Sequence, residues 1–568
     1  MPTRLRLLAA AIPALLSAGA AARAQAPAVQ APDASAPNVA VPADSGAAAS
    51  AACQTISSRT SLHALAGRSI RAIDIVTLAP PPLPVPGAAI VDRLHIRTRE
   101  GTVRRQLLFA PGDTVDTLAV AESMRRLRRQ RYLLDAEVVG TICRGAEGVD
   151  LTVTTRDEWS TKPSVQLRAS QTSNISLTER NLLGTGREAS AQLRSRAGDI
   201  GVGVSLSDPW LLGTRVAATF GVSSFHDGGE MYLTLGSRER SVLDRASALL
   251  EMASTTRRPP ADSAGDQFHR TSADLLLTRR LAVTRFGVTA LLFGAEGERA
   301  ALTAGPESIL IGPERVDREF AGVSLGASQR SVRYDTLTWL LPKSPIVDIP
   351  LSYEGEALFA VGGDGVTGGP ALHADLWSGK AWIPAPGSLF IADLWGSGYL
   401  RAGDWEAATA RAAVGYYRAA PRGAWWFRAA GERLLRPDPD IRALALEDGV
   451  ARALPERFRL AEAALSLSAE RSVHVHSLSR SWFVDAAAFG AGTSRWDAAA
   501  PSPEQVTAGV VGVGLRLAPT KVGRGIARLD VGLPVVASAD VRRRPYVAIA
   551  LTPWMGDGRR RDGRERTR

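Results

Sequence analysis

Long apolar runs are missing from this 568-residue chain beyond its first 24 positions, and cysteine is scarce, with only two residues. A membrane-spanning helix needs about 20 consecutive apolar residues. No later segment reaches that length without a charged residue or a turn former. If the chain enters a membrane, it must therefore do so as strands, because a bilayer core accepts only helices and closed barrels.

Motifs for enzymatic chemistry are also missing. Gly322-Val323-Ser324-Leu325-Gly326 fits the nucleophile-elbow pattern, but that motif requires a strand–turn–helix setting, and this segment reads as a continuing strand. His474 and His476 share one face of a predicted strand, yet no third metal ligand is near them in sequence. The glycine-rich segment 362–369 lacks the lysine of a phosphate-binding loop. We therefore predict no enzyme, no catalytic residue, no metal and no cofactor.

The amino terminus has the features of an export signal. Arg4 and Arg6 precede an apolar run over 7–16, and small residues follow up to Ala24. The alternative, a membrane anchor, would need a longer apolar run. We predict a signal peptide over 1–24, followed by a disordered linker over 25–66 that is too rich in Ala, Pro and Ser to build a core.

The net charge of +11 comes largely from arginine. No helical nucleic-acid recognition motif is visible, and an exported protein seldom meets nucleic acid. We therefore predict that the basic surface faces anionic lipid head groups and lipopolysaccharide rather than nucleic acid.

From residue 161 to 555, the chain repeats segments that alternate apolar with polar or small residues, each followed by a turn; 188–196 is the clearest case. Alternation gives a strand one apolar face. A soluble sandwich shows the same alternation, but a sheet of this extent must hide its edges, and closure into a membrane barrel does so. Allowing about 24 residues per strand and connection, we predict a mainly β fold: a transmembrane antiparallel barrel of about 16 strands over 161–555 and a basic tail over 556–568.

Aromatic residues lie near many predicted strand ends. Examples are Trp382, Trp395, Trp425 and Trp426. We interpret them as parts of the interfacial girdles that flank the apolar band of such barrels.

Residues 67–160 read as a small α+β domain with the element order β-α-α-β-β. Its best-marked element is a helix that Asp113 or Asp116 can cap, with Met124 on its apolar face and several arginines in its last turns. We interpret the basic face as a solvated surface. The alternative is a face that binds clients or lipids.

Cys53 and Cys143 flank this domain. In an oxidising compartment, two such cysteines favour a disulfide, which would close a loop of about 90 residues. Two unpaired thiols are the alternative.

Several stretches resemble, in order, proteins of the BamA/TamA outer-membrane assembly superfamily. The domain over 67–160 resembles a POTRA (polypeptide-transport-associated) domain, with Arg105–Phe109 before Gly112-Asp113. Two later runs, 179–186 and 207–214, resemble successive periplasmic turns of those barrels. Their marked residues are Asn181, Gly184, Gly186, Asp208, Pro209 and Gly213.

Two further matches concern the barrel interior. In the superfamily, an arginine in a loop folded into the barrel pairs with an aspartate in a Phe-x-Asp-x-Gly strand. Arg452 stands at the first position here, and Phe483 and Asp485 stand at the second. The resemblance implies a lumen lock between Arg452 and Asp485, although alanines replace the glycines of both motifs. The alternative is that Arg452 is an ordinary loop arginine.

The resemblance implies an outer-membrane protein of a Gram-negative-type bacterium with a periplasmic amino-terminal domain. Its implied function is to assist insertion, assembly or translocation of polypeptides through a lateral seam between the first and last strands. Tyr546 and Trp554 mark the expected last strand. Expected partners are outer-membrane lipids, unfolded outer-membrane or secreted polypeptides, and periplasmic chaperones or accessory proteins. The alternatives are a dedicated secretion pore for one partner and a non-transporting surface antigen or structural barrel.

Overall fold

The computed structural model of the chain describes residues 53–57, 63–80, 95–143, 147–167, 172–196, 199–225, 228–236, 241–257, 267–303, 318–337, 347–436, 462–478, 482–497, 504–519, 525–537 and 545–553. The predicted signal peptide, Arg452, Trp554 and the tail over 556–568 lie outside these ranges. No helix within them is long and apolar enough to cross a membrane.

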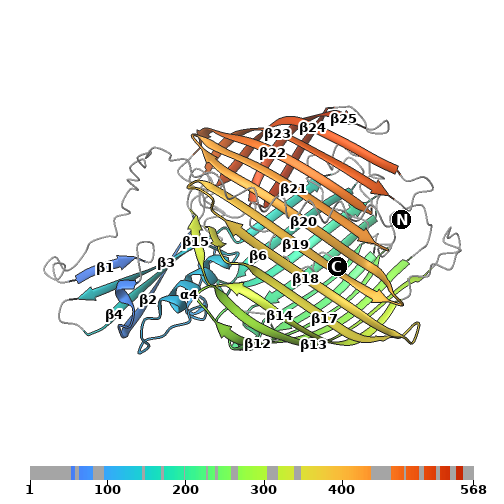
Figure 1. The fold of residues 1–568 in the computed structure, drawn as a ribbon. Coiled ribbons are helices and arrows are strands. Elements are labelled where there is room, and N and C mark those ends of the chain that lie inside the picture. The colour runs from blue at the N-terminus through green and yellow to red at the C-terminus, as the bar shows by residue number, and fades with distance from the viewer. Residues whose placement is uncertain are drawn as a thin grey trace. The chain divides into compact units, whose positions relative to one another are not determined.

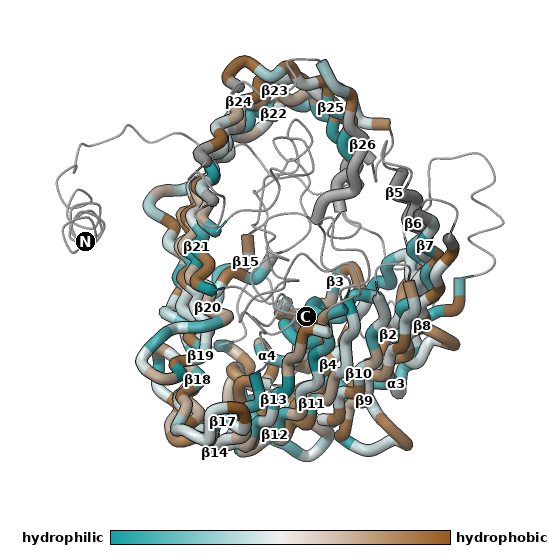
Figure 2. The backbone as a smooth tube through the Cα atoms, turned by 90° about the vertical axis from the view of Figure 1, so that its right-hand side faces the viewer, coloured by the Kyte–Doolittle hydropathy of each residue, from teal (hydrophilic) through white to brown (hydrophobic). Residues whose placement is uncertain are grey.

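The larger part of the structure is a closed antiparallel β-barrel of 20 strands (Figure 1). Strands pair in chain order, except that β14 pairs with β17, and the ring closes where β26 lies beside β5 (Figure 2). The strands are β5 (Thr161–Leu167), β6 (Thr172–Leu182), β7 (Arg187–Arg196), β8 (Asp199–Asp208), β9 (Ala218–Phe225), β10 (Gly228–Gly236), β11 (Ala246–Arg257), β12 (Gln267–Val283), β13 (Gly287–Thr303), β14 (Arg318–Ser331), β17 (Glu354–Asp364), β18 (Pro370–Trp382), β19 (Ser388–Arg401), β20 (Asp404–Ala420), β21 (Gly423–Leu435), β22 (Ala463–Ser477), β23 (Trp482–Asp497), β24 (Glu504–Pro519), β25 (Gly525–Ala537) and β26 (Tyr546–Pro553).

The strand number differs from the predicted 16, because many connections are shorter than the prediction allowed. Ala402-Gly403 alone joins β19 to β20, and Pro421-Arg422 joins β20 to β21. Ala402, Gly403 and Arg422 have φ values of 48°, 91° and 59°, the left-handed backbone that tight hairpins of this twist require. Because the turns are short, more of the chain lies in strands, and the barrel has more strands than predicted.

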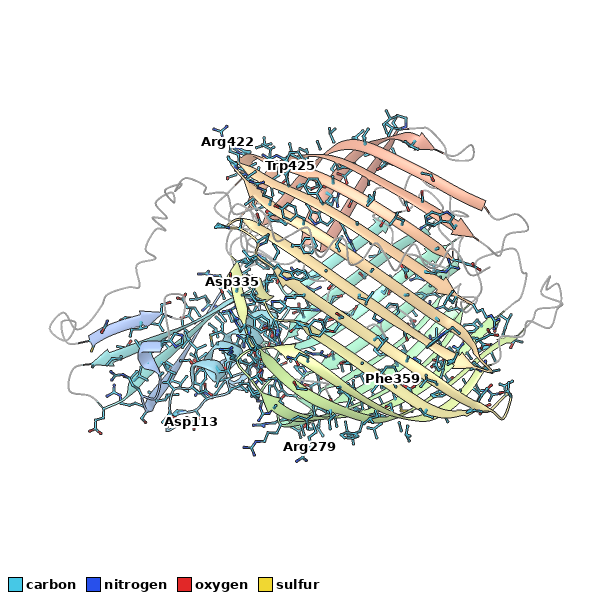
Figure 3. All side chains as sticks on the ribbon, in the orientation of Figure 1. Asp113, Arg279, Asp335, Phe359, Arg422 and Trp425 are labelled. Carbon is cyan, nitrogen blue, oxygen red and sulfur yellow. The ribbon has the colours of Figure 1, made fainter. Side chains whose placement is uncertain are left out.

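The outer face of the barrel is apolar. In β8, every second residue from Ile200 to Leu206 exposes an aliphatic side chain, and Ile200 is 74% exposed. Phe359 of β17 and Val323 of β14 point outward in the same way (Figure 3). A water-soluble protein buries such side chains, so this surface is matched to an apolar surrounding.

A four-stranded sheet with two helices forms the small domain. Its strands follow the order β1-β3-β4-β2, and β2 and β4 are parallel. The elements are β1 (Cys53–Ser57), the short 3-10 helix η2 (His63–Leu65), β2 (Ile70–Leu78), α3 (Glu100–Arg104), α4 (Thr117–Arg129), β3 (Leu133–Cys143) and β4 (Val149–Asp157). The predicted order β-α-α-β-β is confirmed from β2 onward.

The domain begins earlier than the predicted boundary at residue 67. β1 adds a strand to its sheet, and Leu65 of η2 is completely buried in its core. Part of the predicted linker over 25–66 is therefore domain. The segment before β1 is rich in alanine, so composition alone does not reveal the few structured residues that follow it.

Cys53 and Cys143 are both disulfide-bonded. They are the only cysteines in the chain, so the bond joins β1 to the end of β3. It fastens the outermost strand of the sheet, a strand of only five residues.

Cys143→Ser should lower the free energy of unfolding of the small domain by about 4 kcal/mol, because the crosslink restricts the unfolded chain. Amide hydrogen exchange of the full-length protein should become faster in β1 and β3 first. Ser57→Ala, a change in β1 that leaves the crosslink intact, is the control. Alkylation of both cysteines in the unreduced, denatured wild type would contradict the prediction.

Candidate functional site

The inner wall of the barrel holds paired charges. On β13, Phe293 points outward, so Glu298 faces the lumen. Glu298 lies between two arginines: Nε of Arg270 and Nε of Arg318 are each 2.9 Å from one of its carboxylate oxygens. Arg318 is only 1% exposed. Two cations around one carboxylate satisfy a group that would be very costly to bury alone.

The same wall continues with aromatic and ionic contacts. His373 Nδ1 lies 2.6 Å from Glu296, and its ring stacks on Tyr399 at 4.3 Å. Arg401 donates from Nη2 to Asp364 at 2.6 Å. The sequence analysis did not identify this group. Glu296 and Glu298 alternate along β13, and acidic residues in an otherwise apolar strand indicate that basic partners lie nearby.

A second charged group lines β22 to β25. Arg516 on β24 donates from Nη2 to Glu470 at 2.6 Å and also binds Asp530. Across from Arg516 in the register lies Asp485 of β23, which is 2% exposed. Asp485 belongs to the predicted lock, and its position on the inner wall is compatible with that role.

The partner that the structure gives Asp485 is a histidine. His474 Nδ1 lies 3.2 Å from the Asp485 carboxylate, and Phe483 packs edge-on against the His474 ring at 5.9 Å. Arg452 lies outside the described residues, so the lock between Arg452 and Asp485 stays a prediction. A bulge between His474 and His476 places His476 opposite Val484. The two histidines therefore do not share a face, contrary to the sequence interpretation.

The turn over 179–186 reverses the chain and also binds the segment that precedes α3. The Asn181 carboxamide accepts a hydrogen bond from the Gly186 amide at 2.8 Å and donates one to Thr98 at 2.9 Å. Gly184 has φ 71°, and its carbonyl accepts from the Arg99 amide at 2.9 Å. A side chain at Gly184 would collide with the Arg97 carbonyl. These marked residues join the barrel to the segment that precedes α3.

The turn over 207–214 has the expected chemistry. Asp208 accepts from the Trp210 amide at 2.8 Å and from Arg187 at 2.9 Å, which closes the turn around Pro209. Gly213 has φ 77°. The Arg105 guanidinium of the small domain lies 5.9 Å from the Trp210 ring. Both predicted turns thus contact the same domain.

The seam between β26 and β5 joins short strands. β5 has seven residues and β26 has eight, whereas β12 and β13 have 17 each. Tyr546 begins β26, and its ring lies against Gly532 of β25. No hairpin connection joins β5 to β26, so these two strands can separate without a turn that holds them together.

Helix α4 departs from the expected solvated surface. Asp116 caps it by accepting from the Leu118 amide at 2.8 Å, as predicted. Its arginines, however, are largely buried: Arg125 is 5% exposed and Arg126 is 6% exposed. Burial lowers the pKa of the Arg126 guanidinium from its ordinary value, and Asp244 of the barrel opposes that shift. The basic helix is therefore a contact surface within the molecule.

Three solved structures are similar in fold to the chain. CdiB from Escherichia coli is 13% identical, with 87% of this chain and 79% of that one covered and a TM-score of 0.43. BamA from Haemophilus ducreyi, in a structure lacking POTRA domains 1–3, is 12% identical over 84% of this chain and 85% of that one, with a TM-score of 0.40. CdiB from Acinetobacter baumannii is 12% identical over 88% and 77%, with a TM-score of 0.37. No protein-family model and no curated protein sequence matches the chain.

Replacing Asp485 tests the lumen lock. If Arg452 pairs with Asp485, Arg452→Ala and Asp485→Ala should each cost about 3 kcal/mol, because either change leaves the other charge buried alone. The double variant should be no less stable than the worse single variant. The measurement is the temperature at which the barrel changes its gel mobility. His474→Ala separates the contribution of the observed histidine contact. Strictly additive losses would show that Arg452 and Asp485 are uncoupled.

Proposed function

We propose that this protein is an outer-membrane barrel whose small domain lies in the periplasm and which assists insertion, assembly or translocation of polypeptides through the seam between β5 and β26. The observation that carries the proposal is the pairing of β5 with β26, the first and last strands of the closed ring, which no hairpin connection joins. The proposed activity is non-enzymatic and uses no cofactor or metal.

The membrane setting rests on the outer surface. The aliphatic band is bounded by aromatic and basic residues at one end of the barrel, where Figure 3 shows Trp425 and Arg422 together. The rings of Trp425 and Phe427 stack at 6.0 Å, and Arg471 lies 5.3 Å from the Trp425 ring. Aromatic rings beside cations suit a membrane interface with anionic head groups. Trp395 and Trp426 belong to the inner wall, so only Trp382 and Trp425 of the named tryptophans fit a girdle.

The even strand number supports the orientation. The small domain precedes β5, and after 20 strands the chain returns to the same side of the barrel. An exported chain whose amino-terminal domain stays in the periplasm would therefore also keep its carboxyl end there. β21 would end and β22 would begin on the opposite, external side.

The mechanism we propose for the seam is strand addition. Opening it exposes the backbone amides and carbonyls of β5 and β26, and an incoming strand can satisfy them by pairing with either edge. Specificity would come from alternate side chains, since one face of the new strand meets lipid and the other meets the lumen. Clients would accordingly be polypeptides with alternating apolar residues.

A dedicated pore for one secreted partner is the second candidate. The described residues contain a single small domain before the barrel, and one domain offers less surface for receiving many different clients. On the strands next to the seam, Asp530 of β25 and Ser176 of β6 face the lumen, because the residues on either side of each point outward, and polar groups suit a translocation path. Genome context would separate the candidates, because a dedicated pore is expected beside the gene for its passenger.

Depletion of the protein tests the function directly. The protein itself should fractionate with the outer membrane and run faster on gels before heating than after it. On depletion, proteomics of outer membranes should show loss of several barrel proteins if it is an assembly factor, or of one secreted protein if it is a dedicated pore. Recovery of the protein as a soluble periplasmic monomer would refute the membrane assignment, and an unchanged proteome and secretome would refute transport.

Photo-crosslinking tests the seam. A photoreactive amino acid at Val547 of β26 should capture polypeptide clients. The same residue at Val323 of β14 should not, because β14 lies between β13 and β17, away from the seam. The two valines are matched controls, being 69% and 70% exposed. Mass spectrometry of the adducts should identify barrel precursors or one passenger. Equal capture at both positions would contradict a seam-specific role.

A further inference from the structure

The barrel contains a separate two-stranded hairpin between β14 and β17. Its strands are β15 (Tyr334–Leu337) and β16 (Val347–Pro350), which pair only with each other among the described residues. The hairpin leaves the ring at the end of β14 on the side where the small domain lies. A lone two-stranded hairpin is at best marginally stable in water, so its position depends on what it packs against.

One side of the hairpin packs on the inner wall of the barrel. Leu337 is 1% exposed and Ile349 is 5% exposed. Leu394 points outward from β19, so Leu389 and Ile391 on the same strand face the lumen. The hairpin residues share one apolar cluster with these inward residues and with Ala381, Tyr417 and Ala424. Figure 2 shows β15 within the ring, beside β20 and β21.

The other side of the hairpin is held by helix α4. Arg128 makes a bidentate pair with Asp348, with Nε–Oδ2 and Nη2–Oδ1 distances of 2.8 Å each. The Arg125 guanidinium lies over the Tyr334 ring at 4.3 Å, and Arg129 donates to the Tyr334 hydroxyl at 3.2 Å. Three arginines of one helix thus bind two residues of the hairpin.

The helix is tethered to the barrel at a second point. The Glu122 carboxylate, completely buried, pairs with Arg125 and accepts from the Val242 amide and the Ser241 hydroxyl at 3.3 and 3.2 Å. Residues 241–242 lie in the connection between β10 and β11. Helix α4 therefore bridges the hairpin and the β10–β11 connection of the barrel.

We propose that the β15–β16 hairpin is a plug at the domain-side mouth of the lumen and that α4 is the latch that holds it. The plug is reversible because one of its two attachments is polar and can be exchanged for other polar contacts. A small apolar patch holds the hairpin on the barrel wall. On its other side, ionic and cation–π contacts hold it to α4, and water or a competing anion can replace these contacts. A partner that draws α4 away would free the hairpin from the wall, and its departure from the lumen mouth would open the barrel.

This inference rests on the proposed membrane barrel but makes a claim of its own about regulation. A cysteine substituted for Leu337 reports release, since the two native cysteines are disulfide-bonded and do not react with maleimide. In the otherwise wild-type protein, reconstituted into vesicles, labelling of Leu337→Cys should be slow. Adding Asp348→Asn or Arg128→Ala should raise the labelling rate by about tenfold or more, because a partly buried bidentate pair is lost. The same variants should raise ion conductance in planar bilayers.

Charge reversal supplies the decisive control. Arg128→Asp with Asp348→Arg should return both labelling and conductance toward the wild-type values. Arg71→Ala breaks another arginine–aspartate pair of the same domain, with Asp150, and should change neither. Labelling that stays slow in both single variants would overturn the latch. Faster labelling without increased conductance would overturn the plug. Failure of every variant to insert into bilayers, judged by heat-dependent gel mobility, would instead count against the proposed membrane barrel.

Discussion

The closure of one sheet into a ring determines nearly everything else about this protein. A strand buried in an apolar surrounding must pair its backbone on both sides, and only a closed ring does this for every strand. Closure fixes an inside and an outside, so the alternation along the strands gives an apolar outer wall and an inner wall that carries the charged residues together with some apolar clusters. The inner charges then need partners, which explains the arginine–carboxylate pairs around Glu298 and Arg516.

These pairs are distributed unevenly around the ring. β12 and β13, with 17 residues each, and the first residue of β14 carry the Arg270–Glu298–Arg318 group. The part of the wall that carries it gains both long backbone ladders and buried ion pairs, whereas the seam joins the shortest strand to one of the next shortest. A barrel built in this way has a stiff side and a compliant side. Under the proposed function, opening at the seam would need no separate hinge.

The sequence was sufficient for features that depend on local chemistry. Period-two alternation predicted the barrel, and Asn181, Gly184 and Asp208 marked turns that the structure contains. Features that depend on contacts between residues far apart in the chain could not be predicted from local sequence. The arginines of α4 look solvated in sequence because two of their main partners, Asp348 and Tyr334, lie more than 200 residues away. The strand number was underestimated because tight turns at non-glycine residues such as Ala402 leave little trace in composition.

The connection between the domain and the first barrel strand has a mechanical consequence. Only Glu158, Trp159 and Ser160 separate β4 from β5, and all three are buried. Asp157, at the end of β4, accepts from the Thr98 amide at 2.8 Å, and Glu158 pairs with Lys162 of β5 at 2.6 Å. A connection that is short, buried and held by these contacts is rigid, so it can pass a rotation of the domain to the barrel. Under the proposed function, a rotation of the domain would twist β5, one of the two strands at the seam, and would strain the backbone pairing between β5 and β26.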